Sequence, residues 1–380
     1  MRYIVFFTIV AALIGGFVGA IGFGVAASGV IPIKASSGHW AITEWMLHFS
    51  MRRSIATHTI GDELPALDDP ALVLRGAGHY EGGCKPCHGS PEIFEPRVAR
   101  AMLPPPPDLK PAATKWQPEE LFYIIKHGIK FTGMPAWPTP DRDDEIIAVV
   151  AFLQALPQLD AAAYRKLVHG PGEEAVSSPA LAELSGRAPT ASQSCARCHG
   201  RTGEGRENAA FPRLAHQREG YTLAALDAYA NDQRFSGVMQ PIAAALSVDE
   251  RKALAKYYAD QARPAPAGPA AYARDSGSAP HESAHAQRVA RGREIATHGI
   301  ADQRVPACAS CHGPRPEKRN AEYPRIAGQY AEYLVQQLEL FHRHARGGSK
   351  HHHLMHKAAT PLQPEQIRDV AAFYASLADD

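Results

Sequence analysis

The longest apolar segment of the chain lies at its N-terminus. Residues 3–33 carry no charged side chain, and residues 4–27 supply 24 consecutive, mostly apolar positions. About 20 such residues are enough to cross a bilayer. A cleaved signal peptide is the alternative, with residues 25–27 as its small-residue cleavage site, although the apolar region of a signal peptide usually has only about 7–15 residues. We therefore expect residues 1–33 to form an uncleaved transmembrane anchor. Both alternatives export the rest of the chain, and Arg2 predicts a cytoplasmic N-terminus.

A shorter segment with helical periodicity follows the anchor. Ile42, Trp45, Met46 and Phe49 recur at i, i+3, i+4 and i+7, which places them on one helix face. Tryptophan close to a membrane span is typical of the interfacial aromatic belt. We expect residues 34–68 to form a connecting segment that either lies on the membrane surface or docks against a partner.

Three apolar runs with helical spacing recur in the remainder of the chain. Each run reads as the same closing helix, used three times. Pro, Ser and Asp residues before each run are typical helix starts. Segments rich in Pro, Gly, Ala and Ser at 169–179 and 263–281 read as connectors. The pattern predicts an all-α chain whose three units cover residues 69–160, 180–261 and 284–380, with closing runs at 146–153, 254–258 and 370–377.

The six cysteines of the chain form three C-x-x-C pairs, and a histidine directly follows each pair. C-x-x-C-H is the attachment signature of c-type haem. Positions i and i+3 of a helical turn face the same side, so each thiol can form a thioether with a haem vinyl group while the next histidine reaches the iron. The sequence therefore predicts three covalently attached haems c, held by Cys84, Cys87 and His88, by Cys195, Cys198 and His199, and by Cys308, Cys311 and His312.

Other uses of these cysteines explain the pattern less well. A structural zinc site usually combines two C-x-x-C pairs about 20 residues apart, whereas successive pairs here lie over a hundred residues apart. A thioredoxin-like motif needs only one copy, in a strand–helix pattern. Disulfide bonds would not explain a histidine after every pair.

Methionines at similar distances after the three motifs are candidates for the second axial ligand of each haem. Met134, Met239 and Met355 lie 46, 40 and 43 residues after the motif histidines, and each has an aromatic residue 18 positions later. Methionine is the common second ligand in cytochromes c, where it raises the potential. Met355 has competitors, because a neighbouring histidine can also bind iron; these are His351, His352, His353 and His356.

Composition and charge exclude several classes of protein. The 40 Lys and Arg balance 39 Asp and Glu, so the chain lacks the basic excess of a nucleic-acid-binding protein. A hydrophobic content of 45% is ordinary for a globular protein and excludes both wholesale disorder and a polytopic membrane protein.

On these motifs, residues 69–380 resemble class I c-type cytochromes in three tandem copies. Units two and three share Phe211-Pro212-Arg213 and Tyr323-Pro324-Arg325 and are similar to periplasmic diheme cytochromes. The whole chain is similar to membrane-anchored triheme cytochromes c of proteobacteria. The resemblance implies a small all-α fold around each haem, with an N-terminal and a C-terminal helix that cross.

The resemblance also implies that a proline carbonyl orients each motif histidine. Pro212 and Pro324 match that role, 13 and 12 residues after their histidines, whereas unit one has no proline at that distance. Its four consecutive prolines, 104–107, predict an extended loop. Arg213 and Arg325 would either pair with haem propionates or face solvent.

Electron transfer without bond-making chemistry is the function that the resemblance implies, with no catalytic residue. Relatives accept electrons from periplasmic dehydrogenases of the quinoprotein or molybdenum type. We expect the chain to pass electrons on to quinone or a respiratory oxidase, as a single-pass protein of the inner membrane with its bulk in the periplasm. One alternative is the haem-bearing subunit of a haem–copper oxidase. Another is a multihaem peroxidase, which needs a vacant or labile distal site; a candidate methionine in every unit argues against it.

Overall fold

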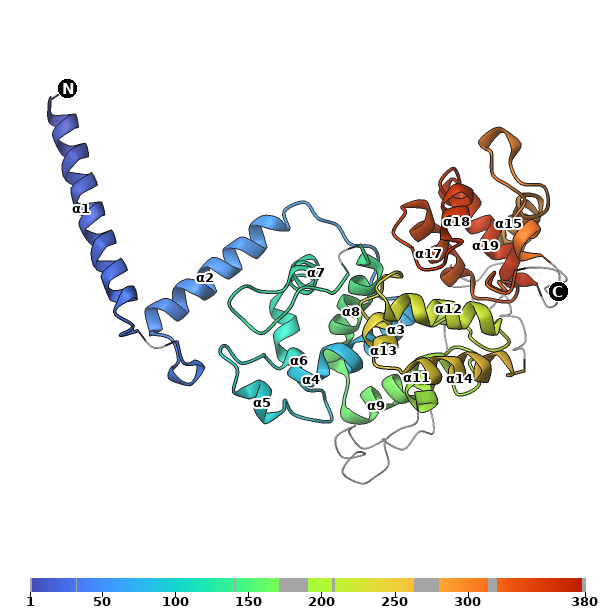
Figure 1. Cartoon of the computed structure of the whole chain (residues 1–380), viewed down its shortest axis with the longest axis horizontal. Helices are drawn as coiled ribbons and strands as arrows, with labels where there is room; N and C mark the ends of the chain where they lie inside the picture. The colour runs from blue at the N-terminus through green and yellow to red at the C-terminus, as the bar shows by residue number, and fades with distance from the viewer. Residues whose placement is uncertain are drawn as a thin grey trace.

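The computed structural model describes residues 2–31, 33–139, 141–170, 191–206, 209–262, 280–313 and 320–377. Within these ranges the regular structure is helical, and the β-type pairing is confined to an isolated bridge between Ile300 and Val305. The predicted all-α class is confirmed. The connectors expected at 169–179 and 263–281 fall mostly outside the described residues. Figure 1 shows two long N-terminal helices that lead away from a body of shorter helices.

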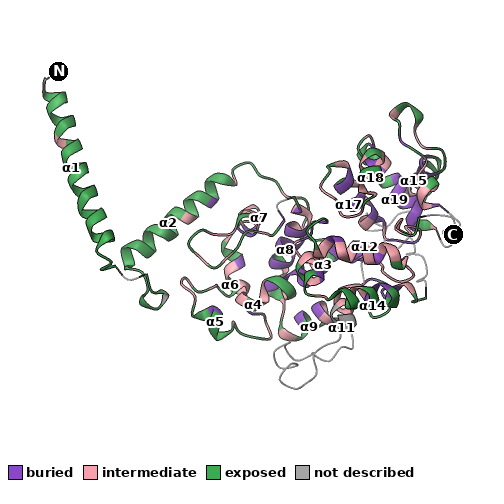
Figure 2. Ribbon diagram, in the orientation of Figure 1, coloured by how far each residue is buried: buried purple, intermediate pink, exposed green. Residues whose placement is uncertain are grey.

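The first helix, α1 (Arg2–Ala27), extends away from the rest of the chain, and nearly all of its side chains are exposed (Figure 2). Within the described residues, Tyr3–Ala27 is the one helical segment long and apolar enough to cross a membrane. Its composition and position suit a membrane anchor and a signal sequence alike.

The second helix, α2 (Ala41–His58), carries the apolar face that the sequence predicts. Trp45 stacks on Phe49 with ring centroids 5.4 Å apart, and both side chains are exposed. Toward its C-terminal end the helix contacts unit one, where the Arg52 guanidinium lies 4.9 Å from the centre of the Trp116 ring.

Unit one is organised by the crossing of α3 (Pro70–Gly83) and α8 (Asp143–Ala155). The side chain of Asp69 accepts a hydrogen bond from the Ala71 N–H and caps the start of α3. The two helices approach closely at Gly76, where a Cβ atom would lie 1.9 Å from the carbonyl oxygen of Ala148. One turn later, Tyr80 packs on Phe152 with ring centroids 5.0 Å apart. The other helices of the unit are α4 (Lys85–His88), α5 (Arg97–Arg100), α6 (Leu109–Ala112), α7 (Pro118–His127) and α9 (Ala161–His169).

The last of these helices, α9, packs into the core of unit one. Tyr164 is fully buried there and donates a hydrogen bond of 2.6 Å to the Glu81 carboxylate. We therefore propose that unit one extends to residue 169 rather than ending at residue 160.

Units two and three repeat parts of this plan. In unit three, α15 (Pro280–His298) crosses α19 (Pro364–Ser376) at Gly292, where a Cβ atom would lie 2.0 Å from the Asp369 carbonyl oxygen. The closing helices of both units begin with capping boxes, formed by Ser247 with Glu250 and by Gln363 with Gln366. Unit two contains α11 (Ala191–His199), α12 (Glu219–Ala230), α13 (Met239–Ala244) and α14 (Val248–Ala259); unit three contains α15 (Pro280–His298), α16 (Ala309–His312), α17 (Ala331–His342), α18 (His352–Ala359) and α19 (Pro364–Ser376).

A reciprocal set of hydrogen bonds joins units two and three. The Gln217 side chain donates to the Arg325 carbonyl (2.8 Å) and accepts from the Arg325 N–H (2.8 Å). Gln329 makes the same pair of contacts with Arg213, both at 3.0 Å. Since each unit presents the same segment to the other, the two units face each other about an approximate twofold axis.

Candidate haem sites

Each C-x-x-C-H motif lies on a helical turn. The first begins where α3 meets α4, the second lies within α11 and the third coincides with α16. Helical hydrogen bonds of 2.9 Å join the His88 N–H to the Cys84 carbonyl and the His312 N–H to the Cys308 carbonyl. This geometry gives each pair of thiols one common side and directs the histidine beside them.

The six thiols are all available for thioether bonds. All six cysteines are free of disulfide bonds. Burial raises the pKa of Cys84 to about 12 and the pKa values of Cys195 and Cys308 to about 11. A zinc site would need thiolates gathered around one point. Within the described part of the chain, no group of three or more potential metal ligands comes together.

A proline carbonyl accepts a hydrogen bond from each motif histidine. The Nδ1–O distances are 3.0 Å from His199 to Pro212 and 3.1 Å from His312 to Pro324, so the contacts expected from the resemblance are present. When Nδ1–H donates to a carbonyl, Nε2 is left free to bind iron, and the ring orientation is fixed.

The equivalent acceptor in unit one is Pro107. Its carbonyl oxygen lies 2.8 Å from Nδ1 of His88, 19 residues away in the sequence. The sequence identifies residues 104–107 as an extended loop but does not assign this contact, because the spacing differs from that of the other two units. The sequence feature that could have indicated this acceptor is the run of prolines, because it holds the backbone extended and exposes its carbonyls.

The second and third motifs share one cavity of about 400 Å³. His199 and Met239 both line it, and so do His312 and Met355. Each histidine–methionine pair therefore borders the same space, which is the arrangement that a haem between two axial ligands needs. In unit one, Met134 and Cys84 are both partly buried and pack against the same core cluster.

Hydroxyl groups position the backbone of two of the methionines. The N–H of Met134 donates to Thr132 Oγ1 at 3.0 Å, and the N–H of Met239 donates to Ser236 Oγ at 3.0 Å. We propose Met134, Met239 and Met355 as the distal ligands, and the histidines, His88, His199 and His312, as the proximal ligands.

Three of the histidines that compete with Met355 have other partners. His351 Nε2 lies 3.0 Å from the Asn320 amide nitrogen, His352 Nδ1 lies 2.5 Å from the Ser349 carbonyl oxygen, and His356 Nε2 lies 2.8 Å from the Arg346 carbonyl oxygen. The contacts of His351 and His356 engage Nε2, whereas the contact of His352 leaves its Nε2 free. His352 also lines the cavity, so it remains an alternative to Met355 as the second ligand of the third haem.

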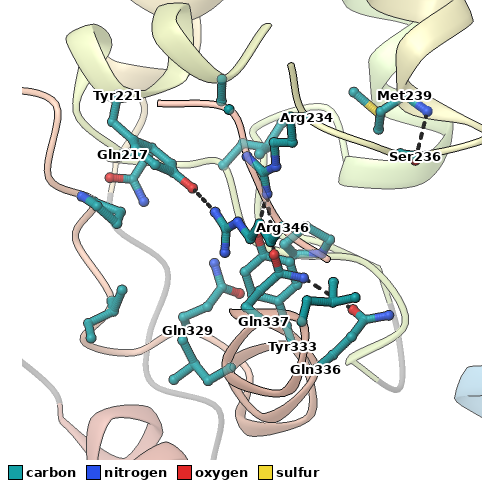
Figure 3. A pocket seen from close by; sticks show the side chains of 18 of the residues that line it. Gln217, Tyr221, Arg234, Ser236, Met239, Gln329, Tyr333, Gln336, Gln337 and Arg346 are labelled. Atoms are coloured by element: carbon teal, nitrogen blue, oxygen red, sulfur yellow. Dashed lines mark hydrogen bonds between the residues drawn. The ribbon is translucent and has the colours of Figure 1, made fainter. Parts of the chain in front are cut away.

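Two arginines, the buried Arg234 and the half-buried Arg346, add positive charge to the shared cavity (Figure 3). Arg346 donates to the Tyr221 hydroxyl at 2.9 Å, and Arg234 lies 3.4 Å from the Tyr333 hydroxyl and 3.3 Å from Gln337 Oε1. Burial raises the pKa of Tyr221, but both guanidinium groups lower it, to about 8 overall. Buried cations need anionic partners, and haem propionates supply them, so this donor set suits the cofactor.

Sequence reasoning did not identify these arginines and emphasised Arg213 and Arg325 instead. Both of those side chains reach backbone carbonyls across the boundary between units two and three. Arg213 donates to the Gly328 carbonyl at 2.7 Å, and Arg325 donates to the His216 carbonyl at 3.4 Å. Arg234 and Arg346 lie five and nine residues before the candidate methionines, Met239 and Met355, and these unequal spacings gave no repeat signal.

Haem stoichiometry tests the motif assignment directly. We expect the mature protein to carry three haems, and the double replacement Cys308→Ala/Cys311→Ala to leave two, because both thioether bonds of one site are lost. A pyridine haemochrome assay against protein concentration measures the number. An unchanged number in the double variant would contradict covalent attachment at the third motif.

Family profiles match most of the region after the N-terminal helices. The profile described as "Cytochrome C oxidase, cbb3-type, subunit III" matches residues 71–153 and 182–257. The profile described as "Cytochrome c" matches residues 289–378. The matches therefore fall on the three segments that contain the C-x-x-C-H motifs.

Characterised relatives match about half of the chain. A thiosulfate dehydrogenase electron acceptor of Stutzerimonas stutzeri is 34% identical over 192 residues, which are 50% of this chain and 82% of that protein. A cytochrome c4 of Thiocapsa roseopersicina is 30% identical over 48% of this chain and 86% of its own length. Among solved structures, cytochrome c4 of Acidithiobacillus ferrooxidans is 33% identical, with a TM-score of 0.40, and matches 48% of this chain and 98% of its own.

Motifs, helical architecture and sequence identity agree on the class of protein. The matched regions cover more than two thirds of the length of each relative, at 30% identity or more. The matching profiles are those of cytochromes c. The chain belongs to the multidomain c-type cytochromes, electron-transfer proteins with covalently bound haem c.

Proposed function

We propose that this chain is a membrane-anchored triheme relay. It takes electrons from a periplasmic dehydrogenase and passes them to quinone or a terminal oxidase. The observation that carries the proposal is the 34% identity to a protein named as the electron acceptor of thiosulfate dehydrogenase, over 82% of that protein. In this proposal α1 holds the chain at the inner membrane, and all three haem units lie in the periplasm.

The ligand sets proposed above suit a relay better than an enzyme. When bound, haem supplies a reversible one-electron couple. The cysteines of each motif would tether the cofactor, and the histidine would be one ligand of its iron. The methionine would be the second ligand, which would leave a substrate no open site to bind. The protein then sets the potentials through the ligands, burial and hydrogen bonds such as that of His199 to Pro212.

We infer that the donor is a thiosulfate-oxidising dehydrogenase, in place of the quinoprotein or molybdenum dehydrogenase expected from the sequence. Two of the relatives, from Stutzerimonas stutzeri and Thiomonas intermedia, carry the name of electron acceptor for that enzyme, at 34% and 32% identity. The pairing of a dehydrogenase with a cytochrome of this class supports a periplasmic redox partner.

Reduction by a purified donor tests this function. The oxidised full chain in detergent, mixed with catalytic amounts of thiosulfate dehydrogenase and with thiosulfate, should develop the α bands of ferrous haem c within the turnover time of the enzyme. Quinoprotein and molybdenum dehydrogenases with their own substrates form the comparison series. If no member of the series reduces the chain above the rate without enzyme, the proposed donor class is wrong.

A haem-bearing subunit of a haem–copper oxidase is the second candidate. The observation in its favour is that the profile matching residues 71–153 and 182–257 describes an oxidase subunit. Purification of the tagged chain from its native membrane separates the two candidates. A large polytopic subunit with oxygen-reducing activity in the complex would favour the oxidase, and a dehydrogenase in the complex would favour the relay.

Spectroscopy tests the remaining alternative, that the protein is a multihaem peroxidase. Three low-spin haems with methionine–iron charge-transfer bands in the near infrared would exclude it, because no distal site would then be open to peroxide. A high-spin fraction that reacts with peroxide would support a peroxidase instead.

A further inference from the structure

One face of α3, a helix of unit one, packs against unit two. Ala71 and Leu74 of α3 share a buried apolar cluster with Ala210 and Phe211 of unit two. At Gly78 the two units approach closely: a Cβ atom there would lie 2.9 Å from the Phe211 ring and 3.4 Å from Cys198 Sγ. The backbone of α3 therefore lies directly against a haem-attachment cysteine of the neighbouring unit.

Unit one also contacts the loop that carries the distal ligand of unit two. The Glu145 carboxylate accepts hydrogen bonds from Ser236 Oγ at 2.5 Å and from the Gly237 N–H at 2.7 Å. The same Ser236 oxygen accepts from the Met239 N–H. Trp137 donates to Glu145 at 3.1 Å and lies so close to Gly237 that a Cβ atom there would be 2.5 Å from its Nε1. Unit one thus contacts both the attachment cysteine Cys198 and the loop that carries Met239 in the second haem site.

Between these two contacts lies His79, the neighbour of Gly78 on α3. Its side chain is 8% exposed, and it lines the cavity of the second haem together with Cys198 and Met239. Neither ring nitrogen has a hydrogen-bond partner among the described residues. Burial, with a smaller contribution from nearby arginines, lowers the pKa of His79 to about 3, so the imidazole is neutral at neutral pH. Buried polar groups normally have partners, so an unpartnered imidazole in this wall indicates that a further group completes the site.

We propose that unit one forms one wall of the second haem site through Gly78 and His79, and that electrons pass between the first and second haems across this contact. The first haem is attached at the end of the same helix. Cys84 lies six residues after Gly78, which is about 9 Å along a helix. A single rigid helix therefore connects an attachment cysteine of the first haem to the cavity of the second. The step moves one electron from ferrous to ferric iron, with no bond made or broken and no proton required.

This inference rests on the proposed relay function, because it says which two haems of the relay exchange electrons directly. It does not depend on the identity of the donor, since it concerns transfer within one chain. A chain that equilibrates electrons among its own haems but accepts none from any dehydrogenase would contradict the proposed function and leave this inference standing.

Gly78→Leu in the full-length holoprotein tests the contact. The new side chain must displace the Phe211 ring or Cys198, the two groups that form this contact between the units. Pulse radiolysis of the oxidised protein gives the rate of electron redistribution among haems that are first distinguished by their potentials. We expect the concentration-independent rate between the first two haems to fall roughly tenfold or more, because small displacements of reacting centres have large effects on rate. Gly83→Leu is the matched control on the same helix, since nothing lies within 4 Å of a Cβ atom there.

His79→Leu provides a second variant that does not force the units apart. If His79 borders the second haem, its loss should shift the potential and the electron paramagnetic resonance signature of that haem and leave those of the third haem unchanged. Wild-type redistribution in Gly78→Leu would overturn the proposal. Unaltered haem signatures in His79→Leu would overturn it as well, including where Gly78→Leu does not accumulate.

Discussion

Replacing Met134 with alanine is expected to convert the first haem from low spin to high spin and to lower its potential by roughly 100 mV or more, because the thioether ligand that raises the potential is lost. The other two haems should keep their spectra, since Met239 and Met355 border a separate cavity. Electronic absorption, magnetic circular dichroism in the near infrared and a redox titration measure these changes in the holoprotein.

Met102→Ala is the matched control for this experiment. Met102 lies beside the same loop, and its terminal methyl carbon is only 1.8 Å from the position that a Cβ atom on Gly133 would occupy. A second thioether is therefore close to the proposed distal ligand. We expect Met102→Ala to leave the first haem low spin. If Met102→Ala opens the site and Met134→Ala does not, the ligand assignment must pass from Met134 to Met102.

Features encoded within a few residues were predictable from the sequence. The C-x-x-C-H turns are local, because a single helical turn sets the direction of both thiols and the imidazole. The three closing helices were also predictable, since apolar spacing and start signals act within one helix. The predicted runs at 146–153, 254–258 and 370–377 fall within α8, α14 and largely within α19.

Features that depend on contacts between distant residues were not predictable in the same way. Glu145 shows this limit, because it occupies the same register after its methionine as Glu250 and Gln366. Those two residues form capping boxes at their own helix starts. Glu145 is instead 3% exposed, and burial raises its pKa. Ser236 and Gly237 of unit two donate hydrogen bonds to it, in addition to Trp137 of unit one. The position of a residue within a repeat does not show which neighbouring unit packs against that residue.

The proline acceptors show the same distinction within one type of site. Pro212 and Pro324 are predictable because units two and three share a local sequence around them. The Pro107 carbonyl accepts the corresponding hydrogen bond from His88, although Pro107 lies at a different distance along the chain from its histidine. The hydrogen bond requires an exposed carbonyl at the right point in space, and loops of different length can supply it. Spacing alone therefore fails wherever a loop has changed length.

Gly76→Val is expected to destabilise unit one by about 3 kcal/mol or more, at the upper end of the usual cost of overpacking. The first atom of the new side chain already meets backbone, since Cβ would lie 1.9 Å from the Ala148 carbonyl oxygen and 2.8 Å from Phe152 Cβ. Backbone atoms cannot rotate away as a flexible side chain can, so α3 and α8 must separate. A whole domain is stable by only about 5–15 kcal/mol, which makes this a large share of the total.

Thermal unfolding, followed through the methionine–iron band of the first haem, measures this loss. Gly83→Val is the control, because it adds the same side chain to α3 in open space, and it should melt like the wild type. Gly292→Val should produce the corresponding loss in unit three, where a Cβ atom would lie 2.0 Å from the Asp369 carbonyl oxygen. The three variants together separate the helix crossing from any general effect of valine. If Gly76→Val unfolds at the wild-type temperature, α3 and α8 do not cross at Gly76 as described, and the two helices cannot set the position of the Cys84 attachment site.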